Sequence, residues 1–149
     1  MRATVQRVSQ AQVVVDDKVV GRIDHGLLVY IGVAPDDGLD DVTYIADKVT
    51  GLRIFNDEAG KMNRSVIDIA GGVLAISAFA LQADARKGRR PSFDGAAPPE
   101  LAQQRYDEVC AAIAQRGVRV ERGIFRAHML VSSVNDGPIC ILLDSKRLF

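Results

Sequence analysis

The amino-acid sequence predicts an α+β fold whose sheets are mainly antiparallel. Strand-like runs come in groups at both ends of the chain, whereas helical periodicity is confined to two stretches, residues 39–51 and 98–117. The strict alternation of strands and helices that a doubly wound dinucleotide-binding fold requires is absent. The 149 residues are 48% hydrophobic and 26% charged, which suits one ordinary domain with a core of its own.

In the first half of the chain, turn residues separate strand-like and helical segments. Residues 16–18 are polar and lie between β-branched runs, which predicts a β-hairpin. The apolar run at residues 27–33 has the length of a strand that is buried on both faces. Spacings of three and four then predict a helix over about residues 39–51. After a turn at residues 56–60, we expect a strand over residues 73–80.

The second half begins with a long segment, residues 82–99, that has no periodicity and contains three prolines and two glycines. Such a segment is typical of a surface loop that carries function. Pro98 and Pro99 favour the start of a helix, and Gly117 favours its end. Three strand-like runs complete the chain, at residues 118–124, 128–134 and 139–144.

Composition argues against membrane, secreted and metal-binding proteins. No stretch approaches the roughly 18 consecutive apolar residues that cross a bilayer. Charged residues such as Arg2, Arg7 and Lys18 interrupt any signal peptide, so we expect a cytoplasmic protein without a membrane partner. Cys110 and Cys140 are too few for a disulfide framework and lack the spacing of a zinc site. Both are expected to be reduced thiols, and no metal site is predicted.

Because the positive and negative charges balance, nucleic acid can be attracted only by a local cluster of basic residues. Nineteen basic residues balance nineteen acidic ones, so no net positive field draws the chain to RNA or DNA. The one dense basic cluster consists of Arg86, Lys87, Arg89 and Arg90, and the adjoining Gly and Pro residues predict a loop there. The cluster is either a solvated surface loop or a phosphate contact.

The segment Asn-Asp-Gly-Pro at residues 135–138 lies between two predicted strands. Taken alone, it is ordinary turn chemistry, because Gly tolerates a positive φ and Pro fixes its own. The chain has no glycine-rich phosphate loop, no HExxH and no GxSxG, which excludes the common nucleotide-binding, metalloprotease and serine-hydrolase motifs.

Long stretches of the chain resemble the D-aminoacyl-tRNA deacylases, a family that removes D-amino acids from mischarged tRNA. The most specific stretches are VLAISAFALQADARKGRRPSF at residues 73–93 and GIFRAHMLVSSVNDGP at residues 123–138. Three further segments extend the resemblance, in order, over nearly the whole chain: MRATVQRVSQAQVVV, GLLVYIGV and RIFNDEAGKMN.

The resemblance implies a single deacylase-like domain over residues 1–149, with barrel-like sheets, two main helices and assembly into a homodimer. It implies a hydrolase of carboxylic esters that acts on D-aminoacyl-tRNA and on mischarged glycyl-tRNA, without a cofactor. With aminoacyl-tRNA as the partner, the basic loop becomes the expected contact for tRNA phosphates.

In the family, a Gly-Pro pair with a cis peptide bond enters the partner subunit's pocket, and here that role falls to Gly137 and Pro138. Two neighbouring carbonyls can then accept from the substrate's α-ammonium group, so that a D side chain points outward and an L side chain collides with the main chain. The resemblance assigns Arg7 and Asn135 to the support of this pair. Taken alone, Arg7 would be a surface charge.

The catalytic segment of the family corresponds to Ser77, Ala78, Phe79 and Ala80, where this chain departs from the usual pattern. Glutamine is usual at the position of Ala78, and threonine at that of Ala80. If a threonine hydroxyl were the nucleophile, this chain could not act. Backbone N–H donors to the developing oxyanion would be unaffected, and the resemblance favours them, together with the 2′-hydroxyl of the terminal adenosine.

Three further candidate residues in or near these motifs are Phe79, Cys140 and His128. Phe79 is either an apolar face for the terminal adenine or part of the core. Cys140 stands where the family usually has threonine, and we expect a small buried thiol rather than a nucleophile, because no partner base is established for it. His128 is expected to be an ordinary strand residue and not a general base.

Two other functions are compatible with the sequence. The two alanines could mark a catalytically weakened relative that binds aminoacyl-tRNA, or another nucleic acid, through the basic loop. They could also mark an editing enzyme that has shifted toward another mischarged tRNA. A deacylation assay with D- and L-charged tRNA separates these possibilities.

Overall fold

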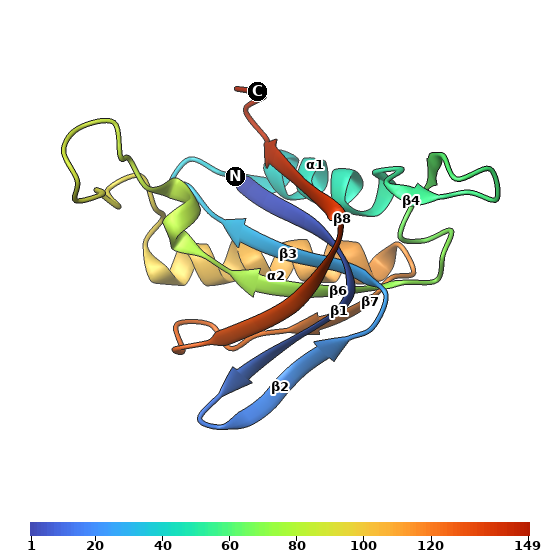
Figure 1. Cartoon of the computed structure of the whole chain (residues 1–149). Helices are drawn as coiled ribbons and strands as arrows, with labels where there is room; N and C mark the ends of the chain where they lie inside the picture. Colours follow the sequence, from blue (N-terminus) through green and yellow to red (C-terminus); the bar gives the residue numbers. More distant parts are fainter.

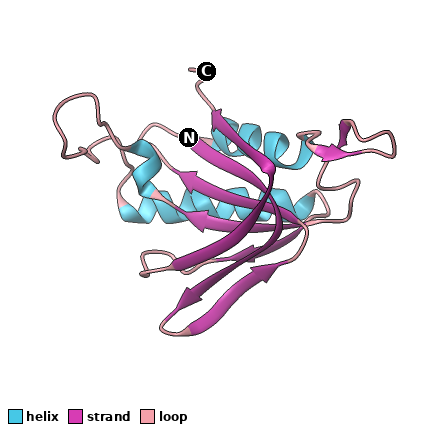
Figure 2. Ribbon diagram, viewed as in Figure 1, coloured by secondary structure: helices cyan, strands magenta, loops and turns pink.

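Six strands form one strongly curved sheet, and two helices pack side by side against it (Figures 1 and 2). The computed structural model describes all residues, 1–149. The strands of this sheet are β1 (Arg2–Val15), β2 (Lys18–Ile23), β3 (Gly26–Gly32), β6 (Gly72–Ser77), β7 (Arg119–Arg122) and β8 (Leu130–Asp144). The remaining elements are α1 (Leu39–Gly51), β4 (Phe55–Asn56), β5 (Met62–Arg64), the short 3-10 helix η1 (Phe79–Gln82) and α2 (Pro99–Gln115).

The sheet is mixed and nearly closed into a barrel. Strand β1 pairs antiparallel with β2, β3 and β8, whereas β3 with β6 and β6 with β7 pair in parallel. The parallel pairs arise because a helix lies in each of these connections, α1 before β6 and α2 before β7. At the far edge, Arg119 of β7 donates to the carbonyl oxygen of Arg22 in β2 at 2.9 Å, which draws the two ends of the sheet together.

The predicted hairpin and both predicted helices are confirmed. Asp16 and Asp17 have positive φ angles of 48° and 62°, as a tight two-residue hairpin turn requires. Helix α1 spans the expected residues, and Asp41 in its first turn accepts a hydrogen bond from the N–H of Gly38 at 2.7 Å. Helix α2 begins at Pro99 and is followed by Gly117 with a φ of 85°.

Two clusters of buried side chains form the core. The larger contains 23 buried residues and lies between the helices and the sheet, where α1 contributes Val42, Ile45 and Val49. The smaller contains seven buried residues inside the curve of the sheet, among them Val8 and Leu28. The strand at residues 26–32 is buried on both faces, as its apolar run predicts. No helix is long and apolar enough to cross a bilayer.

Three boundaries differ from the sequence-based prediction. Strand β6 was expected to reach residue 80 but ends at Ser77, because the chain turns there into η1. Residues 128–134 and 139–144 were expected to form two strands joined by a turn. Residues 130–134 and 139–144 belong instead to one strand, β8, that continues through residues 135–138 because β1 pairs with it on both sides of that segment. Residues 128 and 129 precede this strand. The short hairpin of β4 and β5 had not been predicted.

Candidate active site

The Ser77–Ala80 segment lies where the end of β6 passes into η1. The N–H of Ala78 donates to the carbonyl oxygen of Ile31 in β3 at 2.8 Å, which fixes the start of the turn on the sheet. The N–H of Leu81 then donates back to the carbonyl of Ala78 at 3.1 Å. The N–H groups of Phe79 and Ala80 lie between these two, at the start of a helix that offers them no acceptor of its own. Two main-chain donors are therefore free for a ligand.

These donors lie at a cavity of about 630 Å³ that several distant parts of the chain surround. Strand β3 contributes Tyr30, and the Ser77–Ala80 segment forms one wall. Phe93 comes from the long loop, and the start of α2 and residues 125–129 complete the lining. Fifteen of the nineteen lining residues are hydrophobic. A flat, weakly polar group of a ligand fits such a lining better than a phosphate would.

Phe79 belongs to this cavity and not to the core, so its interpretation as a core residue is wrong, whereas its contact with the terminal adenine stays a prediction. Its side chain is 60% exposed, and its ring meets that of Phe93 edge to face, with the ring centroids 5.0 Å apart. His128 was expected in a strand; it lies instead in the segment before β8, is exposed and lines the same cavity. No local pattern identified Phe93 or His128 as cavity residues, because both approach the cavity from segments that are distant in the sequence.

Gly137 and Pro138 lie within β8, at an irregular part of its pairing with β1. Gln6 pairs with Cys140 and Val8 with Asn135, so that two steps along β1 correspond to five along β8 and the intervening residues bulge out. The Gly137-Pro138 peptide bond is cis, and Gly137 has a φ of 130°. A Cβ at Gly137 would lie 2.7 Å from the side chain of Ile139 and 3.1 Å from the Arg7 guanidinium. Only glycine fits this position without strain.

Asn135 and Arg7 hold the bulge from its two sides. The Asn135 side-chain amide donates to the carbonyl oxygens of Arg7 and Ile139, at 3.0 and 2.9 Å. Arg7 is 8% exposed and donates to the carbonyl oxygens of Ile54, at 2.6 Å, and Asp136, at 3.1 Å. The surface-charge interpretation of Arg7 is therefore wrong. Its planar guanidinium joins segments that are 47 and 129 residues away in the sequence.

Within one chain, the bulge and the cavity are separate. Gly137 and Pro138 are both exposed, and neither lines the cavity formed with Ser77–Ala80. The fold thus brings Arg7, Asn135, Gly137 and Pro138 together as one group, and Ser77, Ala78, Phe79 and Ala80 as another.

The basic cluster lies in the exposed loop between η1 and α2. Arg86 is engaged by Asp84 at 2.6 Å, and its hydrogen bonds hold the pKa of the Asp84 carboxyl well below its usual range. Lys87, Arg89 and Arg90 are exposed and make no ion pair within the chain. Three of the four cationic side chains are thus available to an external anion.

Both cysteines are free thiols, but their surroundings differ. Cys110 is buried in α2, and burial raises the pKa of its thiol. Cys140 was expected to be buried, but it is exposed. It lies at a position of β8 where β1 is the only paired strand, and its side chain points away from the core. Its sulfur accepts a long contact from the Gln6 amide at 3.8 Å. Neither histidine is a hydrogen-bond partner of either thiol, and no three potential metal ligands lie together.

Solved structures of other proteins define the class of fold to which this chain belongs. The structure of a c-Myc DNA Unwinding Element Binding Protein matches with a TM-score of 0.91 and 34% sequence identity, over 97% of this chain and 98% of that one. A probable eukaryotic D-amino acid tRNA deacylase matches with a TM-score of 0.81 and 20% identity, over 95% and 97% of the two chains. The second likeness concerns the fold alone. The architecture is thus that of both solved structures.

Sequence comparison narrows this class to one family. The sequence model of the D-Tyr-tRNA(Tyr) deacylase family matches residues 4–144. A D-aminoacyl-tRNA deacylase of Anaeromyxobacter dehalogenans (strain 2CP-C) is 57% identical, and one of Thermotoga petrophila (strain ATCC BAA-488 / DSM 13995 / JCM 10881 / RKU-1) is 56% identical. Both alignments cover 100% of this chain and 100% of the relative. The chain belongs to the D-Tyr-tRNA(Tyr) deacylase family.

Proposed function

We propose that this protein hydrolyses the ester bond of D-aminoacyl-tRNA and releases the D-amino acid and free tRNA. The observation that carries the proposal is the pair of free main-chain N–H groups, of Phe79 and Ala80, at the edge of an apolar cavity. Family membership supplies the substrate class, since the relatives are named D-aminoacyl-tRNA deacylases. Terminal adenosine enters the cavity, where its base packs against aromatic rings such as that of Phe79.

In the proposed reaction, the ester carbonyl oxygen faces the Phe79 and Ala80 N–H groups. Water adds to the carbonyl carbon, and the negative charge of the tetrahedral intermediate is stabilised by these two donors. One such donor typically contributes ~10²-fold to 10³-fold in rate. The bond from the acyl carbon to the ribose oxygen then breaks, and that oxygen takes up a proton. The neighbouring 2′-hydroxyl of the substrate assists the attack.

This mechanism needs no side-chain nucleophile, which agrees with the residues present. Ala78 and Ala80 have only methyl side chains, and the Cys140 thiol does not line the cavity. The only hydroxyl of the segment belongs to Ser77, and no hydrogen bond to a base activates it. The protein therefore acts through its main chain and requires no cofactor.

Selection of the D enantiomer requires a second copy of the chain in this proposal. Gly137 and Pro138 lie outside their own cavity, on a strand with one unpaired edge and exposed apolar side chains at Leu130, Val134 and Leu142. A homodimer that covers this strand brings the Gly-Pro bulge of one protomer to the cavity of its partner. The carbonyls of the bulge accept from the α-ammonium group, so that L side chains collide with the main chain. A glycyl group has no side chain that could collide, so the site accepts glycyl-tRNA as a substrate.

The basic loop and the cellular location complete the proposed function. Lys87, Arg89 and Arg90 bind backbone phosphates next to the acceptor end, because they are free cations near the loop residue Phe93 of the cavity. An enzyme that edits mischarged tRNA works where translation occurs, so the proposed location is the cytoplasm.

Single-turnover deacylation tests the function directly. We expect rapid release from D-aminoacyl-tRNA and from glycyl-tRNA, and release at the uncatalysed rate from the L-aminoacyl form of the same tRNA. A D-charged tRNA that ends in 2′-deoxyadenosine should react far more slowly. Equal rates for the D and L substrates would contradict the proposed chirality mechanism, and the absence of any release would contradict hydrolysis itself.

A second candidate is a nucleic-acid-binding module without hydrolytic activity. It is favoured by one observation: the 34% identical structural relative is named for binding to a DNA unwinding element. The deacylation assay separates the two candidates, because a binding module releases no amino acid. Such a module would instead retain D-aminoacyl-tRNA or DNA on a filter.

A further inference from the structure

The end of η1 is fixed by two polar side chains that lie outside the Ser77–Ala80 segment. Arg2, at the start of β1, donates through Nη1 to the carbonyl oxygen of Leu81 at 3.1 Å. Gln82 is 8% exposed and donates through Nε2 to the carbonyl oxygen of Gly32 at 2.8 Å. Together with the bond from Ala78 to β3, these contacts fasten both ends of the turn to the sheet.

The Leu81 carbonyl is available to Arg2 because the helix stops there. A further 3-10 hydrogen bond to this carbonyl would come from the N–H of Asp84, but that N–H donates to the carbonyl oxygen of Ser92 across the long loop at 2.8 Å. The last carbonyls of a helix have no partner within the helix and attract a cationic donor. The guanidinium of Arg2 supplies that donor.

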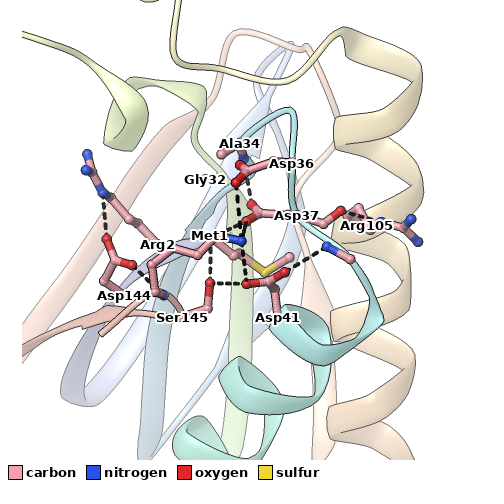
Figure 3. A network of polar contacts seen from close by, with 12 residues as sticks. Met1, Arg2, Gly32, Ala34, Asp36, Asp37, Asp41, Arg105, Asp144 and Ser145 are labelled. Atoms are coloured by element: carbon pink, nitrogen blue, oxygen red, sulfur yellow. Dashed lines mark hydrogen bonds and ion pairs between the residues drawn. The ribbon is translucent and has the colours of Figure 1, made fainter. Parts of the chain in front are cut away.

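Arg2 is itself oriented by Asp144, the last residue of β8 (Figure 3). The two residues are opposite each other in the pairing of β1 with β8, and Arg2 Nε donates to Asp144 Oδ2 at 3.0 Å. The Asp144 side chain is 3% exposed, and its other oxygen accepts from the N–H of Lys146 at 2.7 Å. A fixed carboxylate therefore holds the guanidinium in the plane from which it reaches Leu81.

Gly32, at the end of β3, lies directly against this turn. A Cβ at this position would lie 2.8 Å from Cβ of Leu81 and 2.9 Å from the carbonyl oxygen of Ala78. Both distances are too short for real contacts, so any side chain at residue 32 must displace the turn. The absence of a side chain lets η1 lie directly on the end of β3.

We propose that Arg2, oriented by Asp144, is a positioning residue of the candidate active site. By holding the Leu81 carbonyl, it sets the direction in which the N–H groups of Phe79 and Ala80 point into the cavity. This inference rests on the proposed function, because only an oxyanion requires those donors in a fixed geometry. The contacts of Arg2 with the Leu81 carbonyl and with Asp144 are independent of the substrate.

The test compares Arg2→Gln and Arg2→Lys with a matched control, Arg22→Gln. Arg22 also lies on a strand of the barrel, but its side chain is 62% exposed and its nearest carboxylate, Asp24, is 3.8 Å away. For folded Arg2→Gln we expect kcat to fall about 10-fold to 100-fold while KM changes less than about threefold. Arg2→Lys should recover part of the rate, since lysine keeps the charge but cannot serve both acceptors in the fork geometry. A kcat within about twofold of the control would overturn the proposal.

Hydrogen exchange provides a readout that does not depend on activity. The hydrogen-bonded amides of residues 81–83 should exchange faster in Arg2→Gln and in Gly32→Ala than in the natural chain, whereas Arg22→Gln should leave them unchanged. Unchanged exchange in Arg2→Gln also overturns the proposal, even if its rate is low. If the natural chain releases no amino acid, the proposed function fails, and the exchange measurement still decides whether Arg2 holds the turn.

Discussion

Arg7 illustrates how a single residue gains its role from the fold. In the sequence it is one of several arginines in strand-like segments, and nothing local distinguishes it. In the structure it is buried and satisfies the carbonyls of Ile54 and Asp136, while Asn135 donates back to its own carbonyl. A buried guanidinium without these acceptors would be strongly destabilising. The charge is therefore tied to the geometry of the Gly137-Pro138 bulge.

At the same scale, Ala80→Thr tests whether the chemistry uses the main chain. Ala80 is exposed, so a threonine fits without repacking. Because the hydroxyl adds to the side chain and leaves the N–H in place, we expect single-turnover hydrolysis of D-aminoacyl-tRNA to change by less than about fivefold. The control is Cys140→Ser, which removes the other nucleophile candidate and should also leave the rate unchanged. If the natural chain is inert and Ala80→Thr reacts rapidly, the main-chain account is wrong.

At the scale of elements, the start of α1 and the two chain ends form one polar network (Figure 3). The α-ammonium group of Met1 contacts Asp37 at 2.5 Å and Ser145 Oγ at 2.7 Å, and that hydroxyl donates to Asp41 at 2.6 Å. Burial alone would raise the pKa of the Asp41 carboxyl. Hydrogen bonds from Ser145 and the Gly38 N–H, together with Lys146, outweigh it and lower the pKa to about 2.

This lowered pKa predicts how stability depends on pH. A carboxyl that ionises more readily in the folded state contributes stability above its unfolded pKa of about 4 and loses that contribution as the pH falls toward 2. Asp41→Asn should therefore lower the free energy of unfolding by about 2 kcal/mol at neutral pH, and the difference should shrink between about pH 4 and 2. The neighbouring Asp40→Asn, at an exposed position, is the control. Urea unfolding at several pH values measures both, and a difference that persists at pH 2 would contradict the assignment.

The long loop between η1 and α2 carries a prediction for tRNA binding. Lys87, Arg89 and Arg90 have no carboxylate partner in the chain, so each can release a counterion on binding a phosphate. Arg89→Ala combined with Arg90→Ala should weaken tRNA binding and reduce the slope of log Kd against log salt by about 0.7 to 0.9 per contact removed. Lys18→Ala, in the exposed hairpin turn, should leave the slope unchanged. If the slope of the double variant is unaltered, the loop is a solvated surface loop that makes no phosphate contact.

At the scale of the whole molecule, the proposed active site is divided between two protomers. A mixture of two inactive variants, Gly32→Ala and Gly137→Ala, therefore should recover activity. Refolding them together gives about half heterodimers, each with one intact site out of two, so about a quarter of the natural activity should return. Each variant alone should remain inactive, because the first displaces the Ala78–Gln82 turn and the second distorts the bulge.

Two controls accompany the mixing experiment. The mass of the mixture in solution must be that of a dimer, and each variant must unfold cooperatively. Heterodimers that form without any recovered activity would show that both motifs act within a single chain. A monomeric natural protein with full activity would contradict the shared site as well.

Short-range patterns account for the part of the fold that the sequence predicted. The hairpin at residues 16–18 follows from two turn residues between β-branched runs, and helix α1 follows from the spacing of Val42 through Val49. The Gly-Pro and Ser77–Ala80 motifs could be recognised by resemblance to the family because each is a run of consecutive residues. In each of these cases, the information lies within about fifteen neighbouring residues.

Only the tertiary structure decided how these pieces meet. The sequence indicated neither that β8 runs unbroken past Pro138 nor that Arg2 reaches Leu81, 79 residues away. It also did not indicate that Phe93 and His128 line the same cavity as the Ser77–Ala80 segment. The physical reason is that periodicity reports which face of an element is buried, whereas strand order, parallel pairing and the reach of one side chain depend on loop closure over long distances. The sequence thus determined the hairpin, the two helices and the family, whereas long-range packing determined the unbroken strand β8, the turn at η1 and the lining of the cavity.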